Sequence, residues 1–366
     1  MKTTDLLTQW SALSLEEIET QLASPEGGRT ARKVYGVATV RALQAAPRRA
    51  AIGPAEPVVL LPGIMGPLLA SIRGVTALLW INPALFLEGK SNYLELNADT
   101  TGDADPMIEA TPVSIEKIFY LKISLILRRE AQLFEFPYDW RRPIEHNADV
   151  LASSLERWAT GNPDRKFTLL GHSMGGIVAR AYLTRHPRLA ERRVKRVISL
   201  GTPYFGAAGA VENMINGNDM MALAQALNNG NAPQQMLLSF PSVYQLLPAP
   251  ADLFPASRPY PANWDLYRAS EWRWPAIRQD YLDLARRSTA TCRTSKRCRS
   301  PAATSRPPPT CAAPSTPANG RGWKSSSRRP ARMPATLPCP CGRPSCPARS
   351  YIMSIKGIAT SLPTTG

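Results

Sequence analysis

The sequence predicts an α/β fold, in which helices cover both faces of a mostly parallel β-sheet. Wholly apolar runs such as "PVVLL" at 57–61 end in turn residues, as buried parallel strands do. Such runs alternate along the chain with amphipathic helical patterns, an order typical of parallel sheets. After about residue 286 the apolar periodicity stops, so we expect the folded part to lie before that point.

Residues 1–54 are expected to form a helical extension. Ser14 and Glu17 have the spacing of a capping box, and apolar residues recur at helical spacing as far as Leu22. The stretch 24–28, "SPEGG", is expected to break this helix, and a second helical pattern covers 30–46.

Residues 55–286 are expected to form the α/β domain. Strands are predicted in the stretches 56–66, 131–140, 166–170 and 193–200. Helices are predicted over 147–161, where Gly161 ends the pattern, and over 176–186. Residues 207–280 show no clear strand and are expected to form a helical cap over the carboxyl ends of the strands.

Residues 287–366 differ in composition from the rest of the chain. The formal charge of the chain is +16, but this tail holds 14 Lys and Arg residues and no acid, which leaves +2 on the first 286 residues. All six cysteines lie in the tail at spacings that match no zinc or redox pattern, so we expect neither a metal site nor a cofactor. Rich in Pro, Ser and Arg, the tail is expected to be disordered.

No stretch of the sequence has the length and apolar character of a signal sequence or a membrane span, so we expect a cytoplasmic protein. The most apolar window, 74–89, is interrupted by Asn82 and Pro83. We expect it to be a core or cap segment, and contact with lipid is the alternative.

The candidate nucleophile is Ser173. Gly171, His172, Ser173, Met174 and Gly175 match the G-x-S-x-G pattern between a predicted strand and a predicted helix. A sharp turn there would lift the serine hydroxyl above the sheet and place the Met174 amide where an oxyanion would form. The Ile64 amide, in the loop after the first strand, is the candidate second donor. Ordinary structural turns are the alternative at both places.

Four motifs in this order, "PVVLLPGIMG", "FPYDWR", "GHSMGG" and "GTPYFGA", resemble the lecithin:cholesterol acyltransferase-like family of α/β-hydrolases. The resemblance covers about residues 55–286. It implies an α/β-hydrolase fold with a cap, Ser173 as acyl-accepting nucleophile, and Ile64 and Met174 as the oxyanion hole. It also places Tyr138 and Trp140 near the substrate region, whereas Asp139 and Arg141 are better explained as a structural ion pair.

The resemblance also implies an acid and then a histidine after the serine, and neither motif appears in 287–366. The sequence has three histidines, and none suits the role of the catalytic base. His146 precedes the serine, His172 lies in the turn itself, and His186 is expected to be a solvated residue of the helix that follows. A shifted reading frame joins the last base of each codon to the first two bases of the next codon. In that frame the codons over 334–342 permit the sequence G-D-A-T-V-P-L-W, and those over 351–361 permit Y-Y-V-x-x-G-H-S-D-L. We therefore expect a frameshift between about 286 and 334, which leaves the translated fold incomplete at its C-terminus.

Two functions follow from these observations. The first is a serine-dependent acyl hydrolase or acyltransferase that acts on lipid esters, with possible transient contact with a membrane surface, and that is impaired as translated. The second is a non-catalytic protein of this fold whose basic tail binds anionic lipid or nucleic acid through phosphate contacts. Nucleic acid is the less favoured partner, because the tail has only Trp323 and Tyr351 for stacking on bases.

Overall fold

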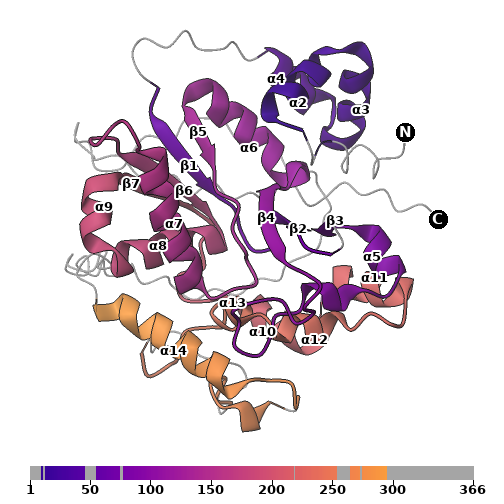
Figure 1. The fold of residues 1–366 in the computed structure, drawn as a ribbon, viewed down its shortest axis with the longest axis vertical. Coiled ribbons are helices and arrows are strands. Elements are labelled where there is room, and N and C mark those ends of the chain that lie inside the picture. The colour runs from indigo at the N-terminus through magenta and orange to yellow at the C-terminus, as the bar shows by residue number, and fades with distance from the viewer. Residues whose placement is uncertain are drawn as a thin grey trace, which may run out of the picture. The chain divides into compact units, whose positions relative to one another are not determined.

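The computed structural model describes residues 10, 13–45, 55–74, 77–217, 219–253, 264–272 and 274–294, which all belong to one compact unit. Its main sheet has four parallel strands in the order β5-β1-β6-β7 (Figure 1). They are β1 (Pro57–Leu61), β5 (Gln132–Glu135), β6 (Phe167–His172) and β7 (Val194–Leu200). All four predicted strands are therefore confirmed, with β1 in the interior as a wholly apolar strand should be.

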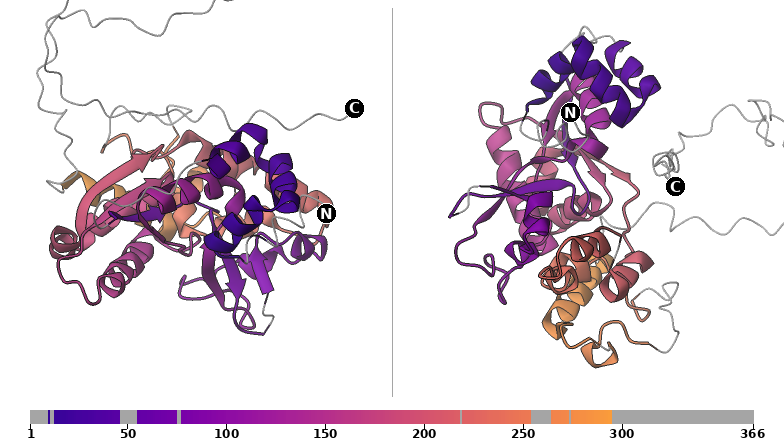
Figure 2. Two further views of the ribbon diagram at one scale, coloured as in Figure 1. Left: turned by 90° about the horizontal axis from the view of Figure 1, so that it is seen from above. Right: turned by 90° about the vertical axis from the view of Figure 1, so that its right-hand side faces the viewer.

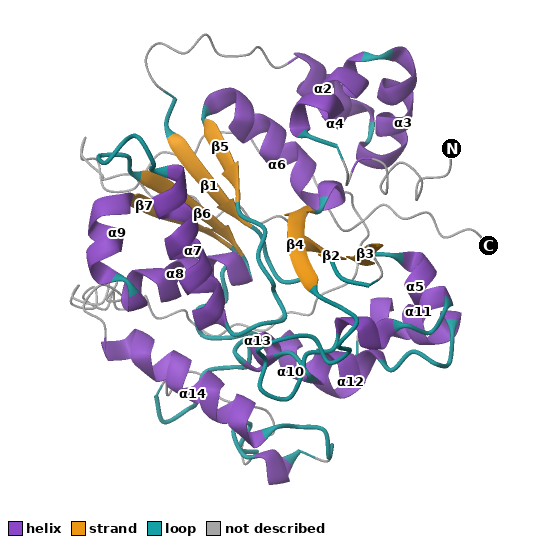
Figure 3. Cartoon of the chain, viewed as in Figure 1, coloured by secondary structure: helices purple, strands orange, loops and turns teal. Residues whose placement is uncertain are grey.

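Helices cover both faces of this sheet, as predicted. Successive side chains of a strand point to opposite faces. Val59 and Leu61 of β1 pack with α7 (Ile144–Trp158) and α8 (Met174–Arg185), whereas Val58 and Leu60 pack with α6 (Lys117–Glu130). Helix α9 (Pro187–Arg193) lies beside α7 and α8 (Figure 3). This is the arrangement of an α/β-hydrolase fold.

A second, antiparallel sheet follows β1, and the sequence did not indicate it. Its strands are β2 (Pro67–Ser71), β3 (Ala77–Trp80) and β4 (Ala110–Ile115), in the order β3-β2-β4. Helix α5 (Pro83–Leu87) and the 3₁₀ helix η1 (Ser91–Leu94) come between β3 and β4. The apolar window 74–89 thus forms β3 and α5, and most of its large side chains are buried, which agrees with the core interpretation.

Among its described residues 13–45, the N-terminal segment forms three helices where two were predicted: α2 (Leu15–Ala23), α3 (Pro25–Tyr35) and α4 (Val37–Ala45). The capping box of Ser14 and Glu17 is present. Ser24 ends α2 but also caps α3, because its hydroxyl accepts a hydrogen bond from the Gly27 amide, so the stretch 24–28 begins a helix. Gly36, with φ of +79°, then divides the second predicted helix.

The predicted cap is helical in its described residues, and Figures 1 and 2 show its elements together below the sheet. They are α10 (Ala208–Asn216), α11 (Asp219–Leu227), α12 (Pro233–Leu238), α13 (Pro241–Tyr244), the 3₁₀ helix η2 (Ala269–Glu271) and α14 (Gln279–Thr294). The Ser242 hydroxyl donates to the Trp140 carbonyl at 2.5 Å, and the Ala207 amide donates to the Leu246 carbonyl at 2.9 Å. These bonds hold α13 against the segments that follow β5 and β7.

The tail was expected to be disordered from residue 287, but residues 287–294 form the end of helix α14. The rest of the tail, from 295 on, and the expected frameshift lie outside the described part of the chain. In the described part, every helix is too short or too polar to cross a membrane.

Candidate active site

The candidate nucleophile occupies the sharp turn between β6 and α8. β6 ends at His172 and α8 begins at Met174, which leaves Ser173 at φ +51° and ψ −123°. A positive φ is strained for a residue with a Cβ, and such strain is concentrated at functional sites. The Ser173 amide donates to the Leu200 carbonyl of β7 at 2.9 Å, so the neighbouring strand holds the turn in this conformation.

The glycines of the turn have no room for a side chain. A Cβ on Gly175 would lie 2.3 Å from the Leu61 carbonyl oxygen and 2.5 Å from that of Pro62. One on Gly171 would lie 2.5 Å from the Gly176 Cα, and one on Gly176 would lie 2.0 Å from the Thr202 hydroxyl. Helix α8 can therefore approach the ends of β1 and β7 only because these positions are glycine.

Gly175→Ala is expected to lower the free energy of unfolding by about 1–3 kcal/mol, because backbone atoms that cannot rotate away occupy the Cβ position. The matched control is Gly209→Ala near the start of α10, where an added Cβ meets nothing within 4 Å. That control is expected to be neutral or stabilising by up to ~1 kcal/mol. Urea unfolding of both variants measures the difference, and equal effects would show that the close approach does not exist.

The loop after β1 lies directly against this turn. A Cβ on Gly63 would be 3.0 Å from the Ser173 Cβ. The loop closes through a hydrogen bond from the Gly66 amide to the Gly63 carbonyl at 3.1 Å, and Met65 takes a φ of +62°. Within the described segments, neither the Ile64 amide nor the Met174 amide has a hydrogen-bond acceptor. Both donors are thus available on the two segments that flank Ser173, as an oxyanion hole requires.

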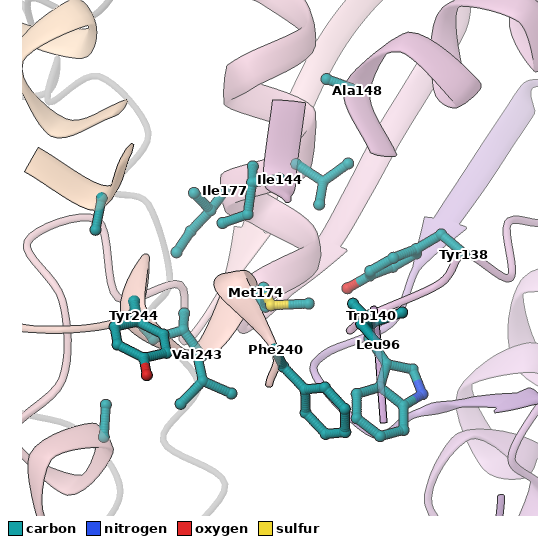
Figure 4. Close-up of a cluster of buried hydrophobic side chains, with 14 of the residues drawn as sticks. Leu96, Tyr138, Trp140, Ile144, Ala148, Met174, Ile177, Phe240, Val243 and Tyr244 are labelled. Atoms are coloured by element: carbon teal, nitrogen blue, oxygen red, sulfur yellow. The ribbon is translucent and has the colours of Figure 1, made fainter. Parts of the chain in front are cut away.

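Three buried aromatic side chains hold this loop in place. The Tyr138 hydroxyl donates to the Pro62 carbonyl at 2.7 Å, the Trp140 indole to the Pro67 carbonyl at 3.0 Å, and the Trp80 indole to the Met65 carbonyl at 2.8 Å. Figure 4 shows Tyr138 and Trp140 in the apolar cluster that also contains Met174 and Phe240. Both side chains have no exposed surface, and their hydrogen bonds support the loop.

Comparison with known proteins gives a family match for the part of the chain that holds this geometry. Residues 121–276, which include Ser173, match the lecithin:cholesterol acyltransferase (LCAT) family. This stretch of the chain resembles that family.

Two curated proteins from Arabidopsis thaliana are similar to part of the chain. Lecithin-cholesterol acyltransferase-like 4 is 27% identical over 126 residues, which are 32% of this chain and 23% of the relative. Phospholipase A(1) LCAT3 is 25% identical over 128 residues, which are 34% of this chain and 29% of the relative. The matched part of the chain thus spans only about a quarter of the length of these relatives.

Two solved structures also align with the chain, both at low similarity. Lipase BlEst2 of Bacillus licheniformis in its mature form is 19% identical with a TM-score of 0.30, over 56% of this chain and 59% of the lipase. A chain of the Tle4–Tli4 complex is 14% identical with a TM-score of 0.37, over 64% of this chain and 71% of that one.

A buried ion pair lies in the segment that follows β5. The Arg141 guanidinium is fully buried and donates two hydrogen bonds to Asp139, at 2.9 and 2.8 Å. It also donates to Asp103 at 2.6 Å and to the Leu94 carbonyl at 2.9 Å. Burial alone would raise the pKa of Asp139, but the Arg141 charge holds that pKa below its ordinary value. The structural interpretation of this pair therefore agrees with the geometry.

The three histidines do not form a triad with Ser173. His146 is exposed on α7, and the His172 Nδ1 contacts the Tyr120 hydroxyl at 2.7 Å. His186 does pair with a carboxylate, since its Nε2 lies 2.6 Å from Asp149, which corrects the expectation of a solvated residue. That pair lies at the far end of α8, however, about 18 Å from Ser173 for a helix of 12 residues. It cannot reach the serine.

Proposed function

We propose that this LCAT-like protein is a serine-dependent acyl hydrolase or acyltransferase that acts on lipid esters through an acyl-enzyme at Ser173. The observation that carries the proposal is the strained serine turn packed against a loop with a free backbone amide. The turn supplies the hydroxyl, and the adjacent loop and the start of α8 each supply a backbone amide without an acceptor in the described residues. The names of the two relatives, an acyltransferase-like protein and a phospholipase A(1), support a lipid ester as the substrate.

The reaction follows from this arrangement. The Ser173 Oγ attacks the carbonyl carbon of the ester, and the carbonyl oxygen, now an anion, accepts hydrogen bonds from the Ile64 and Met174 amides. A base takes the serine proton and passes it to the departing alcohol as the carbon–oxygen bond of the ester breaks. Water or a second alcohol then attacks the acyl-enzyme, and Ser173 recovers its proton.

The proposal includes a frameshift, because the base and its acid partner are missing from the translated chain. The exposure of β7 supports a continuation of the sheet beyond this strand. Lys195, Arg196 and Ile198 are exposed, although they belong to a strand of the main sheet. In the part of the chain that the structure describes, only β6 pairs with β7, so its outer edge can accept another strand.

The test begins with the DNA across codons 280–340. We expect a missing or extra base, and correcting it should supply the acid and histidine motifs. The frame-restored chain should then hydrolyse a p-nitrophenyl ester up to about 10⁶-fold faster than the chain as translated. A DNA sequence that confirms the frame as translated would contradict the frameshift. A frame-restored chain that does not hydrolyse the ester would contradict the proposed activity.

A further inference from the structure

Tyr120 lies between the two segments that carry the oxyanion donors. It comes from the first turn of α6 and is only 8% exposed. Its ring fills the space beside Gly66, where a Cβ would lie 2.9 Å from the Tyr120 Cε2. The same ring meets the His172 ring edge-on, with 5.7 Å between the ring centroids and 70° between the planes. Tyr120 therefore contacts both the loop after β1 and the serine turn.

The Tyr120 hydroxyl hydrogen-bonds to both segments. It accepts a hydrogen bond from the Gly63 amide at 2.8 Å, and it lies 2.7 Å from the His172 Nδ1. The hydroxyl proton is free to point at Nδ1, because Gly63 occupies an acceptor position on the oxygen. Burial raises the pKa of Tyr120 to about 12, so this proton is present at neutral pH. Burial also lowers the pKa of His172, which favours the neutral ring whose Nδ1 accepts.

We propose that Tyr120 is a positioning residue for the oxyanion hole. Gly63 precedes Ile64, and His172 lies two residues before Met174. One hydroxyl that binds Gly63 and His172 therefore fixes the spacing between the two amides that would hold the oxyanion. The inference rests on the proposed function, and it adds a residue that none of the four sequence motifs contains.

The N-terminal helices hold the helix that carries Tyr120. Leu121 and Leu125 of α6 are buried in a cluster with residues of α2, α3 and α4. The Tyr35 hydroxyl donates to the Lys117 carbonyl at 2.7 Å, one turn before Tyr120. Arg128 and Arg129, at the other end of α6, pair with Glu16 and Glu19 of α2. The extension thus fixes α6 at both ends, and with it the position of Tyr120.

The first test detects the hydrogen bond between the Tyr120 hydroxyl and the His172 Nδ1, and it does not depend on enzymatic activity. The chain has three histidines, so ¹⁵N-histidine labelling of the full chain gives signals that single-histidine variants can assign. We expect the His172 Nδ1 to be unprotonated in the wild type and partly protonated in Tyr120→Phe. Tyr267→Phe is the matched control, since Tyr267 is also 8% exposed and its hydroxyl donates to the Pro248 carbonyl, which belongs to neither the loop after β1 nor the serine turn. It should leave His172 unchanged. A protonated Nδ1 in the wild type, or the same signal in Tyr120→Phe, would overturn the proposal.

The second test measures ester hydrolysis by the frame-restored chain. Tyr120→Phe is expected to lower kcat by about 10- to 100-fold with little change in KM, because misplaced donors act on the transition state. Tyr267→Phe should retain the wild-type kcat. An unchanged kcat in Tyr120→Phe would overturn the role of Tyr120 alone. A restored wild type without activity would instead reject the proposed function.

Discussion

Ser173→Ala in the frame-restored chain is expected to lower kcat for ester hydrolysis by about 10⁶-fold, because no other group can form the acyl-enzyme. The oxyanion hole and substrate binding would remain, so a residual rate about 10³–10⁴-fold above that in water is expected to survive. The measurement is the steady-state rate on a p-nitrophenyl ester.

The matched control is Ser153→Ala on the exposed face of α7, where the hydroxyl contacts only the Asp149 carbonyl at 3.2 Å. It should retain the wild-type rate. Loss of less than about tenfold in Ser173→Ala would mean that the turn is a structural feature and that the chemistry occurs elsewhere.

Arg141→Met is expected to have the largest effect on stability, a loss of about 3–5 kcal/mol in the free energy of unfolding. The substitution removes the buried cation that the carboxylates of Asp139 and Asp103 share, leaves Asp139 with only the longer contact to Arg142 at 3.4 Å, and leaves the Leu94 carbonyl without its donor. Urea unfolding followed by tryptophan fluorescence measures this loss.

Arg185→Met is the control for the loss of an ion pair as such. Arg185 and its partner Asp149 are 42% and 45% exposed, so water screens their interaction. The expected loss is only ~0–1 kcal/mol. If the two variants lost the same stability, the Arg141 network would have no special structural role.

The parts of the fold that the sequence predicted are those with a strong local pattern. β1 and β6 are apolar throughout, and the turn at Ser173 has its glycines at fixed spacing. β4, "ATPVSI", instead contains Pro112 and only one fully buried residue, so its pairing with β2 depends on tertiary context.

Helix α6 was not predicted because it has two apolar faces. Leu121 and Leu125 face the N-terminal helices, whereas Tyr120 and Leu127 face the sheet. A helix covered on two sides lacks the single apolar stripe by which a surface helix is found. For the same reason no sequence pattern indicated that Tyr120 would reach the site.

Only the backbone turns of the candidate site could be predicted from the sequence. Ser173, Met174 and Ile64 lie in motifs that specify turns, and the structure places them together. Trp80, Tyr138 and Trp140 bind carbonyls of the loop from distant positions in the chain, and no spacing rule predicts such contacts. The only available signal was chemical, since a buried indole or phenol needs an acceptor.

The most direct test of the central claim is the mass of the frame-restored chain after reaction with an alkyl p-nitrophenyl phosphonate. This reagent leaves a stable phosphonyl group on an activated serine. We predict one added group per chain, mapped by peptide sequencing to Ser173, and none in Ser173→Ala. A restored chain that stays unmodified, or a group on another residue, would contradict the assignment of Ser173 as the nucleophile.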